Sequence, residues 1–296
     1  MSLNLPSHFV SQFATNIQLL LQQKGSRLRG AVMTGNHIGK QASPVDQIGA
    51  IEMLPVVSQF APMGRVDAAL DRRWVFPLDF DLPQQIDSFD KLRLLTDPKS
   101  KYVENAVAAA GRQMDKLIIA AAHGTSQTGE TGATPTVLPT GQKIAVNYGA
   151  SADVGLTVAK LREAKRILMA ADVDLEADEI YCAIGARQHD NLLAEAQVIS
   201  SDFNGGMPVL KEGRIMEFLG IKFIHTELTN VNLVAGDAQI PMWAKSGMYL
   251  GLWNDMKTSI SVRNDITGEP WQAYVQMTAG ATRLEEEKVV QITCNV

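Results

Sequence analysis

Residues 97–124, DPKSKYVENAVAAAGRQMDKLIIAAAHG, predict one long helix with both ends marked. Asp97 can accept hydrogen bonds from the free N–H groups of the first turn, and Pro98 follows where a missing N–H costs nothing. Gly124 suits a left-handed stop, and His123 lies at the negative end of the helix dipole. Nothing on this spine helix, expected over residues 98–123, suggests catalysis. Small and aliphatic residues at three- and four-residue steps give it a face that can pack closely on a sheet: Val103, Ala106, Val107, Ala110, Met114, Leu117, Ile118 and Ala121.

The composition of the 296 residues is that of an ordinary soluble globular protein, with 46% hydrophobic residues, 20% charged residues and a net charge of −5. A mildly acidic chain does not bind nucleic acid tightly through its overall field. Cys182 and Cys294 form no ligand pattern, so we expect two reduced, buried thiols. The first residues lack a signal-peptide pattern, and no apolar run approaches the roughly 18 residues needed to cross a bilayer. We therefore expect a cytoplasmic protein without membrane contact.

The N-terminal part predicts a short helix followed by an extended arm. Apolar residues share one face of 7–24, and Gly25 can end that helix. The Gly- and Ser-rich stretch that follows has little periodicity. Neither piece has a core of its own, so we expect both to pack on another part of the fold or on a neighbouring chain.

Residues 48–90 predict an extended hairpin, because prolines at positions 55, 62, 77 and 83 exclude a long helix. The chain can reverse around residues 63–64, which lets arms at 50–60 and 65–80 pair. A two-stranded hairpin is marginal by itself in water. A long charged one therefore suggests contact with another subunit, with a solvated flap as the alternative.

Charged residues of this hairpin are candidates for ion pairs between subunits. Their possible partners are the three adjacent carboxylates at 285–287. These carboxylates point in different directions on any regular backbone. If they pair with no other subunit, they predict a solvated turn. The candidate contact residues are Arg65, Asp71, Arg72, Arg73, Glu285 and Glu286.

The rest of the chain predicts an α+β fold. A Gly- and Thr-rich β layer follows the spine helix, and Thr157 can cap a helix over 158–171. An α/β subdomain is expected from this helix, a strand at 179–185, a short helix at 186–195, and a helical turn plus strand within 213–227. The C-terminal strands are expected to form one sheet under the spine helix: 242–252, 258–263, 271–278 and 288–293.

Motifs that could carry chemistry are weak. Ser88 and Lys91 have S-x-x-K spacing but lack the accompanying K-T-G or S-D-N motifs. His189 and Asp190 could form a hydrogen-bonded pair, although such neighbours on a helix are more often structural. The histidines and cysteines give no zinc pattern, and the glycine-rich segment 124–141 lacks a phosphate-loop motif. We predict no catalytic, cofactor-binding or metal-binding residue, and keep a cytosolic α/β hydrolytic enzyme as the alternative.

Several long stretches resemble the major capsid proteins of tailed bacteriophages, which have the HK97-like fold. They are FVSQFATNIQLLLQQKGSRLRGAV, GKQASPVDQIGA, FAPMGRVDAALDRRWVFPLDFDLPQQIDSFDKLRLLTDPKSKYVENAV, QHDNLLAEAQVISSDF, KEGRIMEFLGIKFIHTE and GATRLEEEKVVQI. The resemblance covers nearly the whole chain, and its order and extent carry it rather than a catalytic signature.

The resemblance implies four parts and a shell function. They are an N-terminal arm (1–45), an extended loop (46–90), a peripheral domain holding the spine helix (91–150 and 241–296) and an axial domain (151–240). Copies would form hexamers and pentamers of an icosahedral head around double-stranded DNA, which they would contact weakly and non-specifically. The head would assemble in the cytoplasm of a bacterial host with a scaffolding protein or protease, a portal and decoration proteins.

Some members of this family join subunits through a lysine of the extended loop and an asparagine of a neighbour. This chain has no lysine from Gln41 to Asp90, so its loop cannot supply that bond. Arginines remain for ion pairing there. An encapsulin-like compartment, which shares the fold, is the closer alternative.

Overall fold

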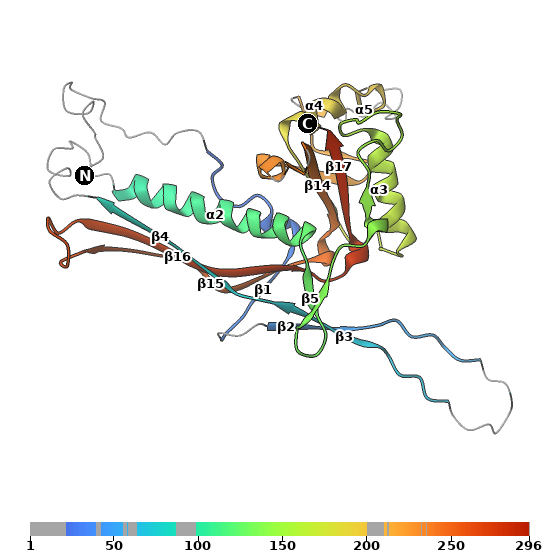
Figure 1. Ribbon diagram of the computed structural model, residues 1–296, viewed down its shortest axis with the longest axis horizontal. Coiled ribbons are helices and arrows are strands. Elements are labelled where there is room, and N and C mark those ends of the chain that lie inside the picture. Colours follow the sequence, from blue (N-terminus) through green and yellow to red (C-terminus); the bar gives the residue numbers. More distant parts are fainter. Residues whose placement is uncertain are drawn as a thin grey trace.

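The computed structural model gives an elongated molecule with a helix lying along a long β-hairpin, an α/β part at one end, and a second hairpin that projects from the body (Figure 1). Most of the helix predicted for 7–24 lies outside the described residues, and Gln22–Lys24 are not helical. Asp97, Pro98, Ser88 and Lys91 also lie outside them. The described residues are 22–39, 43–55, 58, 64–86, 99–199, 210–211, 213–231, 233–234 and 236–295.

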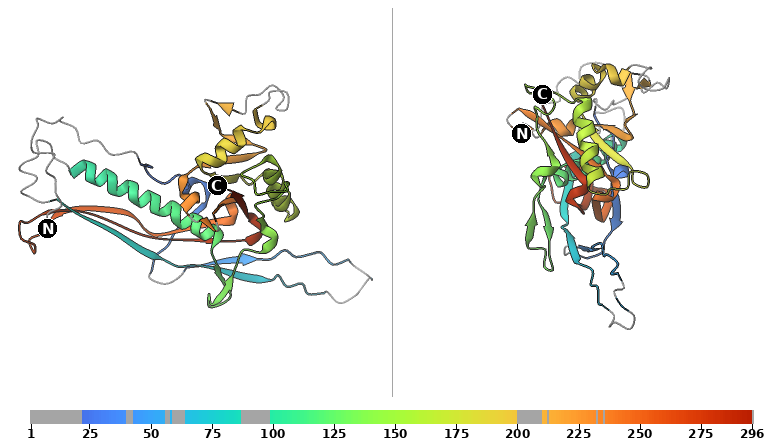
Figure 2. Two further views of the ribbon diagram at one scale, coloured as in Figure 1. Left: turned by 45° about the horizontal axis from the view of Figure 1, so that its top comes forward. Right: turned by 90° about the vertical axis from the view of Figure 1, so that its right-hand side faces the viewer.

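The predicted spine helix is present as α2, Lys99–His123, and packs on a four-stranded sheet. Its buried side chains include Met114 and Ile118, which share a core with Leu250 and Met277 of that sheet. The long antiparallel pair β15–β16 runs beneath the helix (Figures 1 and 2). In order across the sheet, the strands are β1 (Met33–Asn36), β15 (Met248–Val262), β16 (Trp271–Arg283) and β4 (Leu78–Ile86).

The end of α2 differs from the prediction in two ways. The backbone of Gly124 does not have the positive φ of a left-handed stop. A glycine is needed there for a different reason, because the Cβ of any other residue would lie 2.7 Å from the Ala120 carbonyl oxygen. Burial lowers the pKa of His123 to about 4, so this imidazole is neutral near pH 7 and brings no charge to the negative end of the helix. A positive charge at this end of the helix comes instead from Arg283 of β16, whose guanidinium donates to the last carbonyls of α2.

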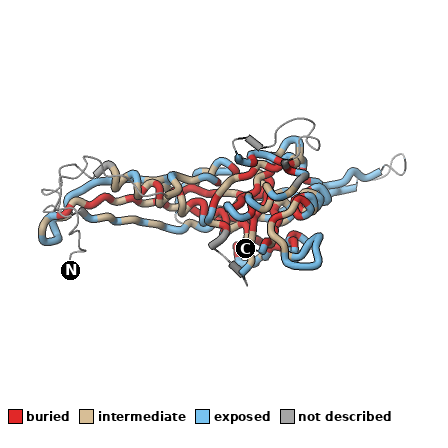
Figure 3. Tube along the Cα trace, turned by 90° about the horizontal axis from the view of Figure 1, so that it is seen from above, coloured by how far each residue is buried: buried red, intermediate tan, exposed pale blue. Residues whose placement is uncertain are grey.

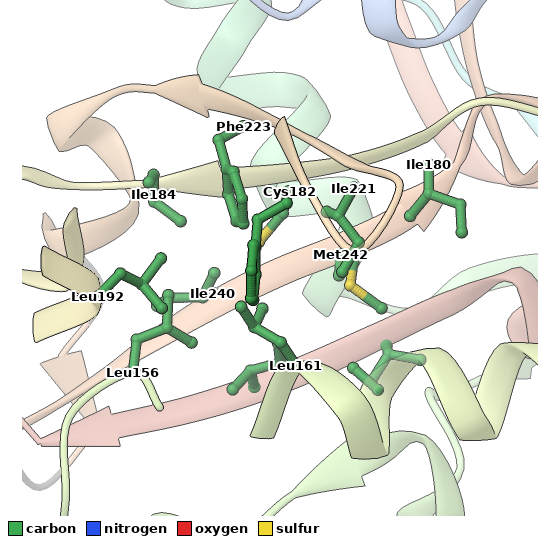
Figure 4. Close-up of a cluster of buried hydrophobic side chains, with 14 of the residues drawn as sticks. Leu156, Leu161, Ile180, Cys182, Ile184, Leu192, Ile221, Phe223, Ile240 and Met242 are labelled. Atoms are coloured by element: carbon green, nitrogen blue, oxygen red, sulfur yellow. The ribbon is translucent and has the colours of Figure 1, made fainter. Parts of the chain in front are cut away.

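A second, seven-stranded sheet and three helices build the α/β part. Thr157 caps α3 as predicted, accepting a hydrogen bond from the Lys160 amide. Figure 4 shows the apolar core between α3 and the sheet, to which Cys182 and Met242 contribute. The helices are α3 (Val158–Ala170), α4 (Ala186–Leu193) and α5 (Ala196–Ile199); the strands are β11 (Glu217–Phe218), β12 (Ile221–His225), β8 (Ile180–Ile184), β14 (Asp237–Ala244), β17 (Val289–Asn295), β7 (Lys143–Ile144) and β13 (Leu233–Val234).

Two predictions about this region are wrong. β14 and β17 pair with each other inside the α/β sheet, so the C-terminal strands do not form one sheet under the spine helix. The helical turn expected within 213–227 is absent, and short strands stand there instead. The first prediction failed because a buried strand has the same apolar pattern whichever sheet it joins. The second failed because a short apolar run is compatible with either a helix or a strand. One of these short strands, β10 (Arg214–Ile215), pairs with β9 (Leu210–Lys211).

A third sheet forms the root of the projecting hairpin. The hairpin pairs residues 43–48 with 70–75, closer to the body than the arms predicted at 50–60 and 65–80. The β layer predicted after the spine helix is present and extends this sheet. The strands, in order, are β2 (Ser43–Ile48), β3 (Leu70–Val75), β5 (Ser126–Thr128) and β6 (Thr134–Thr136).

Short 3₁₀ turns join these parts, and Figure 3 shows the buried positions gathered where α2 and the sheets meet. Both cysteines are free and buried, as predicted. No helix within the described residues is long and apolar enough to cross a membrane. The 3₁₀ turns are η2 (Arg29–Ala31), η3 (Thr140–Gln142), η4 (Glu227–Val231), η5 (Lys245–Gly247) and η6 (Glu286–Lys288).

Candidate self-assembly surface and its anchor

The projecting hairpin, residues 43–55 and 64–75, extends beyond the body of the molecule (Figures 1 and 2). The Gly49 amide donates to the Ala69 carbonyl at 2.7 Å, one step beyond the β2–β3 ladder. Farther out, a Cβ on Gly64 would lie 3.1 Å from Leu54 Cδ1. The two arms therefore stay side by side as they leave the root.

This hairpin exposes large aliphatic side chains that no other described part of the chain covers. Such groupings on a soluble chain mark interaction surfaces, because isolated apolar side chains are common but clusters are not. The most exposed is Met53, at 98%. The others are Ile48, Ile51, Leu54, Val66 and Leu70.

Two candidate arginines of the hairpin form exposed ion pairs within the hairpin itself. Arg65 Nε lies 2.8 Å from Asp67, and Arg72 Nε lies 2.6 Å from Asp46. The Asp71 carboxylate accepts a hydrogen bond from the Arg72 amide. Exposed pairs of this kind contribute about 0–1 kcal/mol each, so these groups can exchange partners at little cost.

Arg73 behaves differently because β3 turns it toward the body. Its two terminal nitrogens donate to the two oxygens of Glu286, at 2.9 and 2.6 Å. Both side chains are nearly buried, with 8% and 11% exposed. The predicted partners thus meet within one chain, where Glu286 begins η6. A role of these two residues between subunits remains a prediction, as it does for Glu285, which pairs with Lys288 at 2.9 Å.

The turn that carries Glu286 is also tied to the hairpin and to the spine helix. Gln47 Nε2 of β2 donates to the Leu284 carbonyl at 3.0 Å. The fully buried Arg283 donates to the carbonyls of Ala121 and Ala122, at 2.9 and 3.1 Å, and so caps the end of α2. Sequence reasoning missed this capping arginine, since the residues lie about 160 positions apart in the chain.

Of the remaining candidates from the sequence, His189 lies within the described residues and makes a structural contact. His189 Nε2 accepts the Ile215 amide at 3.2 Å, which is a structural hydrogen bond, and burial lowers the pKa of this histidine. It lines a cavity of about 710 Å³ with Arg27, Arg214 and His225. No group of three or more potential metal ligands occurs among the residues that the structure describes.

A buried lysine, also missed from the sequence, has a structural role. Lys160 of α3 is fully buried and donates to the carbonyls of Val154 and Thr293, each at 2.8 Å. Burial lowers its pKa. The bond to Thr293 joins α3 to β17, and the bond to Val154 joins α3 to the loop that precedes it.

Comparisons with known proteins agree with this geometry. The family model described as phage capsid protein matches residues 5–296. No curated protein sequence matches the chain. The capsid structure of cyanophage P-SCSP1u superposes with a TM-score of 0.74 at 19% identity, over 97% of this chain and 94% of that one.

Two further solved structures show the same fold at lower identity. The capsid of cyanophage Pam1 matches with a TM-score of 0.70 at 10% identity, covering 99% of this chain and 98% of that one. The capsid of Ralstonia phage GP4 matches with a TM-score of 0.70 at 11% identity, covering 97% of this chain and 95% of that one. The chain therefore belongs to the phage capsid protein family, has the HK97-like fold, and is a capsid shell protein.

Proposed function

We propose that this chain is the main subunit of an icosahedral phage head, in which hexamers and pentamers enclose double-stranded DNA. The observation that carries the proposal is the projecting hairpin, whose exposed aliphatic side chains have nothing to pack against within the described chain. Burying a methionine or leucine side chain contributes about 1.5–3 kcal/mol, so an adjacent copy that covers several of them is strongly held.

We assign the parts of the chain to family roles as follows. Residues 1–45 act as the N-terminal arm and 46–90 as the extended loop. Residues 91–150 with β15 and β16 form the peripheral domain, and 151–240 form the axial domain. The strand pairing supports one adjustment, because β14 and β17 share a sheet with β8 and belong with the axial domain. The role is structural and needs no catalytic group.

The further partners follow from the same proposal. A scaffolding protein or a protease favours shells of one size during assembly in the host cytoplasm, a portal admits the DNA, and decoration proteins bind some heads. The net charge of −5 supports a weak, non-specific contact with the packaged DNA. Arg65, Asp71 and Arg72 would contact neighbouring copies in such a shell, because their exposed contacts within the hairpin can exchange partners at little cost.

A substitution on the hairpin tests the proposal. Met53→Glu places a charge where the neighbour is expected to bury an apolar group, so shells should be lost while the chain still folds, because Met53 is exposed in the single chain. Met53→Leu is the matched control and should assemble. Negative-stain microscopy and light scattering measure shell yield, and circular dichroism checks the fold. Shells of normal yield from Met53→Glu would contradict the proposal.

A further inference from the structure

At the root of the projecting hairpin, β3 is bound on both of its faces to other segments of its own chain. On one face Arg73 binds Glu286 through two hydrogen bonds. On the other face Trp74 Nε1 donates to the Gly129 carbonyl at 2.7 Å. Adjacent residues of a strand point to opposite faces, so these two contacts hold β3 from opposite sides.

The second strand of the hairpin is attached to the same turn as the first. Gln47 of β2 donates to the Leu284 carbonyl, two residues before Glu286. Gln47 pairs with Asp71 and Arg73 with Val45, so Gln47 and Arg73 are diagonal neighbours across the ladder. One short turn, residues 284–286, therefore fixes both strands at one level.

After Arg73 and Trp74, the chain at Val75 and Phe76 crosses the sheet that lies under α2, and it passes too close to β15 and β16 for any side chain to fit between them. A Cβ on Gly280 of β16 would lie 2.1 Å from the Phe76 carbonyl oxygen and 3.2 Å from Val75 Cγ1. A Cβ on its cross-strand partner Gly251 would also lie 3.2 Å from Val75 Cγ1. The absence of a side chain at Gly251 and Gly280 therefore lets the backbone at Val75 and Phe76 lie directly against β15 and β16.

We propose that each subunit sets the direction of its own projecting hairpin before it meets a neighbour, through an anchor formed by Arg73, Gln47 and residues 284–286. Arg283, next to this turn, caps α2. The anchor therefore fixes the orientation of the hairpin relative to the spine helix. A preset arm lowers the entropy that assembly costs and fixes the angle between adjacent copies. The effect on shells rests on the proposed function; the effect on the single subunit does not.

The test measures hairpin direction in the full-length chain. Spin labels on Met53→Cys of the hairpin and Met169→Cys of α3 report one intrachain distance; both positions are exposed, whereas Cys182 and Cys294 are fully buried. Diluting labelled chain with excess unlabelled chain removes distances between copies. Pulsed electron paramagnetic resonance then gives the distance distribution.

The anchor predicts a narrow distribution for the parent and for Arg72→Gln, the matched control on the neighbouring, exposed ion pair. Arg73→Gln and Glu286→Gln should broaden or shift it. Gln47→Ala removes the bond to Leu284 and the 3.4 Å contact with Arg73 Nε but keeps the Arg73–Glu286 pair. It should broaden the distribution less, and it is the deciding variant if the other two misfold. Equal distributions in Gln47→Ala, in every folded anchor variant and in the control would overturn the anchor.

Shell geometry supplies an independent readout. Folded anchor variants should give shells of mixed diameter or open sheets. Arg72→Gln removes one exposed contact that contributes about 0–1 kcal/mol, so it should lower shell yield slightly at most and keep the parent diameter. If the parent forms no shell at all, the proposed function fails while the distance measurement still judges the anchor. Uniform parent-sized shells from the anchor variants would contradict the inference about assembly angle.

Discussion

Buried charges are the most informative residues of this chain. Glu286 interacts favourably with Arg73 and Arg283, while the two guanidinium groups repel each other. Removing one partner of a buried pair costs about 3–5 kcal/mol, because the remaining charge stays desolvated. Charge reversal of Arg73 is therefore expected to damage the fold itself, whereas reversal of the exposed Arg72 affects only the surface of the hairpin. The two arginines, adjacent in sequence, have different roles.

The partly buried histidine at the end of α2, whose two ring nitrogens are buried, predicts a pH dependence of stability. Burial lowers the pKa of His123 from 6.5 to about 4, so between these values the unfolded chain binds a proton that the folded chain does not. Stability contributed by the neutral imidazole is thus lost as the pH falls from 6.5 toward 4, by roughly 3 kcal/mol in all. Urea unfolding across this range should show a smaller decline for His123→Gln than for the parent. Identical pH profiles would refute the assignment.

At the scale of elements, the crossing between the hairpin exit and β16 gives a prediction. Gly280→Ala places a methyl group where the Phe76 carbonyl lies, and overpacking of this kind costs about 1–3 kcal/mol. Gly141→Ala is the control, since a Cβ there meets nothing within 4 Å. Thermal unfolding should show a clearly lower Tm for Gly280→Ala and a nearly unchanged Tm for the control. Equal Tm values would show that the crossing is loose.

The elements that sequence could predict are those defined by local patterns. The small-residue stripe of α2 and the Thr157 cap of α3 are local, and both are present. The assignment of β14 and β17 to a sheet depends on contacts between distant segments, which periodicity does not contain. Likewise, the pairing of Arg73 with Glu286 joins positions 213 residues apart, so sequence indicated the charges and not their partner within the chain.

At the scale of the whole molecule, the resemblance of several long stretches to phage capsid proteins predicted the HK97-like fold, which the family model and the solved capsids confirm. The surface for self-assembly was predictable only as a region. Successive side chains of β3 point to opposite faces of its sheet. The register of β3 decides which residues are exposed and which are bound to the body, and only the structure shows that register.

Cryo-electron microscopy of particles formed by the purified chain shows directly what the projecting hairpin contacts in an assembly. We expect closed shells built of sixfold and fivefold units, in which the projecting hairpin keeps its angle to α2 and buries Met53, Leu54 and Leu70 against an adjacent copy. Shells in which these side chains face solvent, or a chain that stays monomeric under every assembly condition, would contradict this expectation.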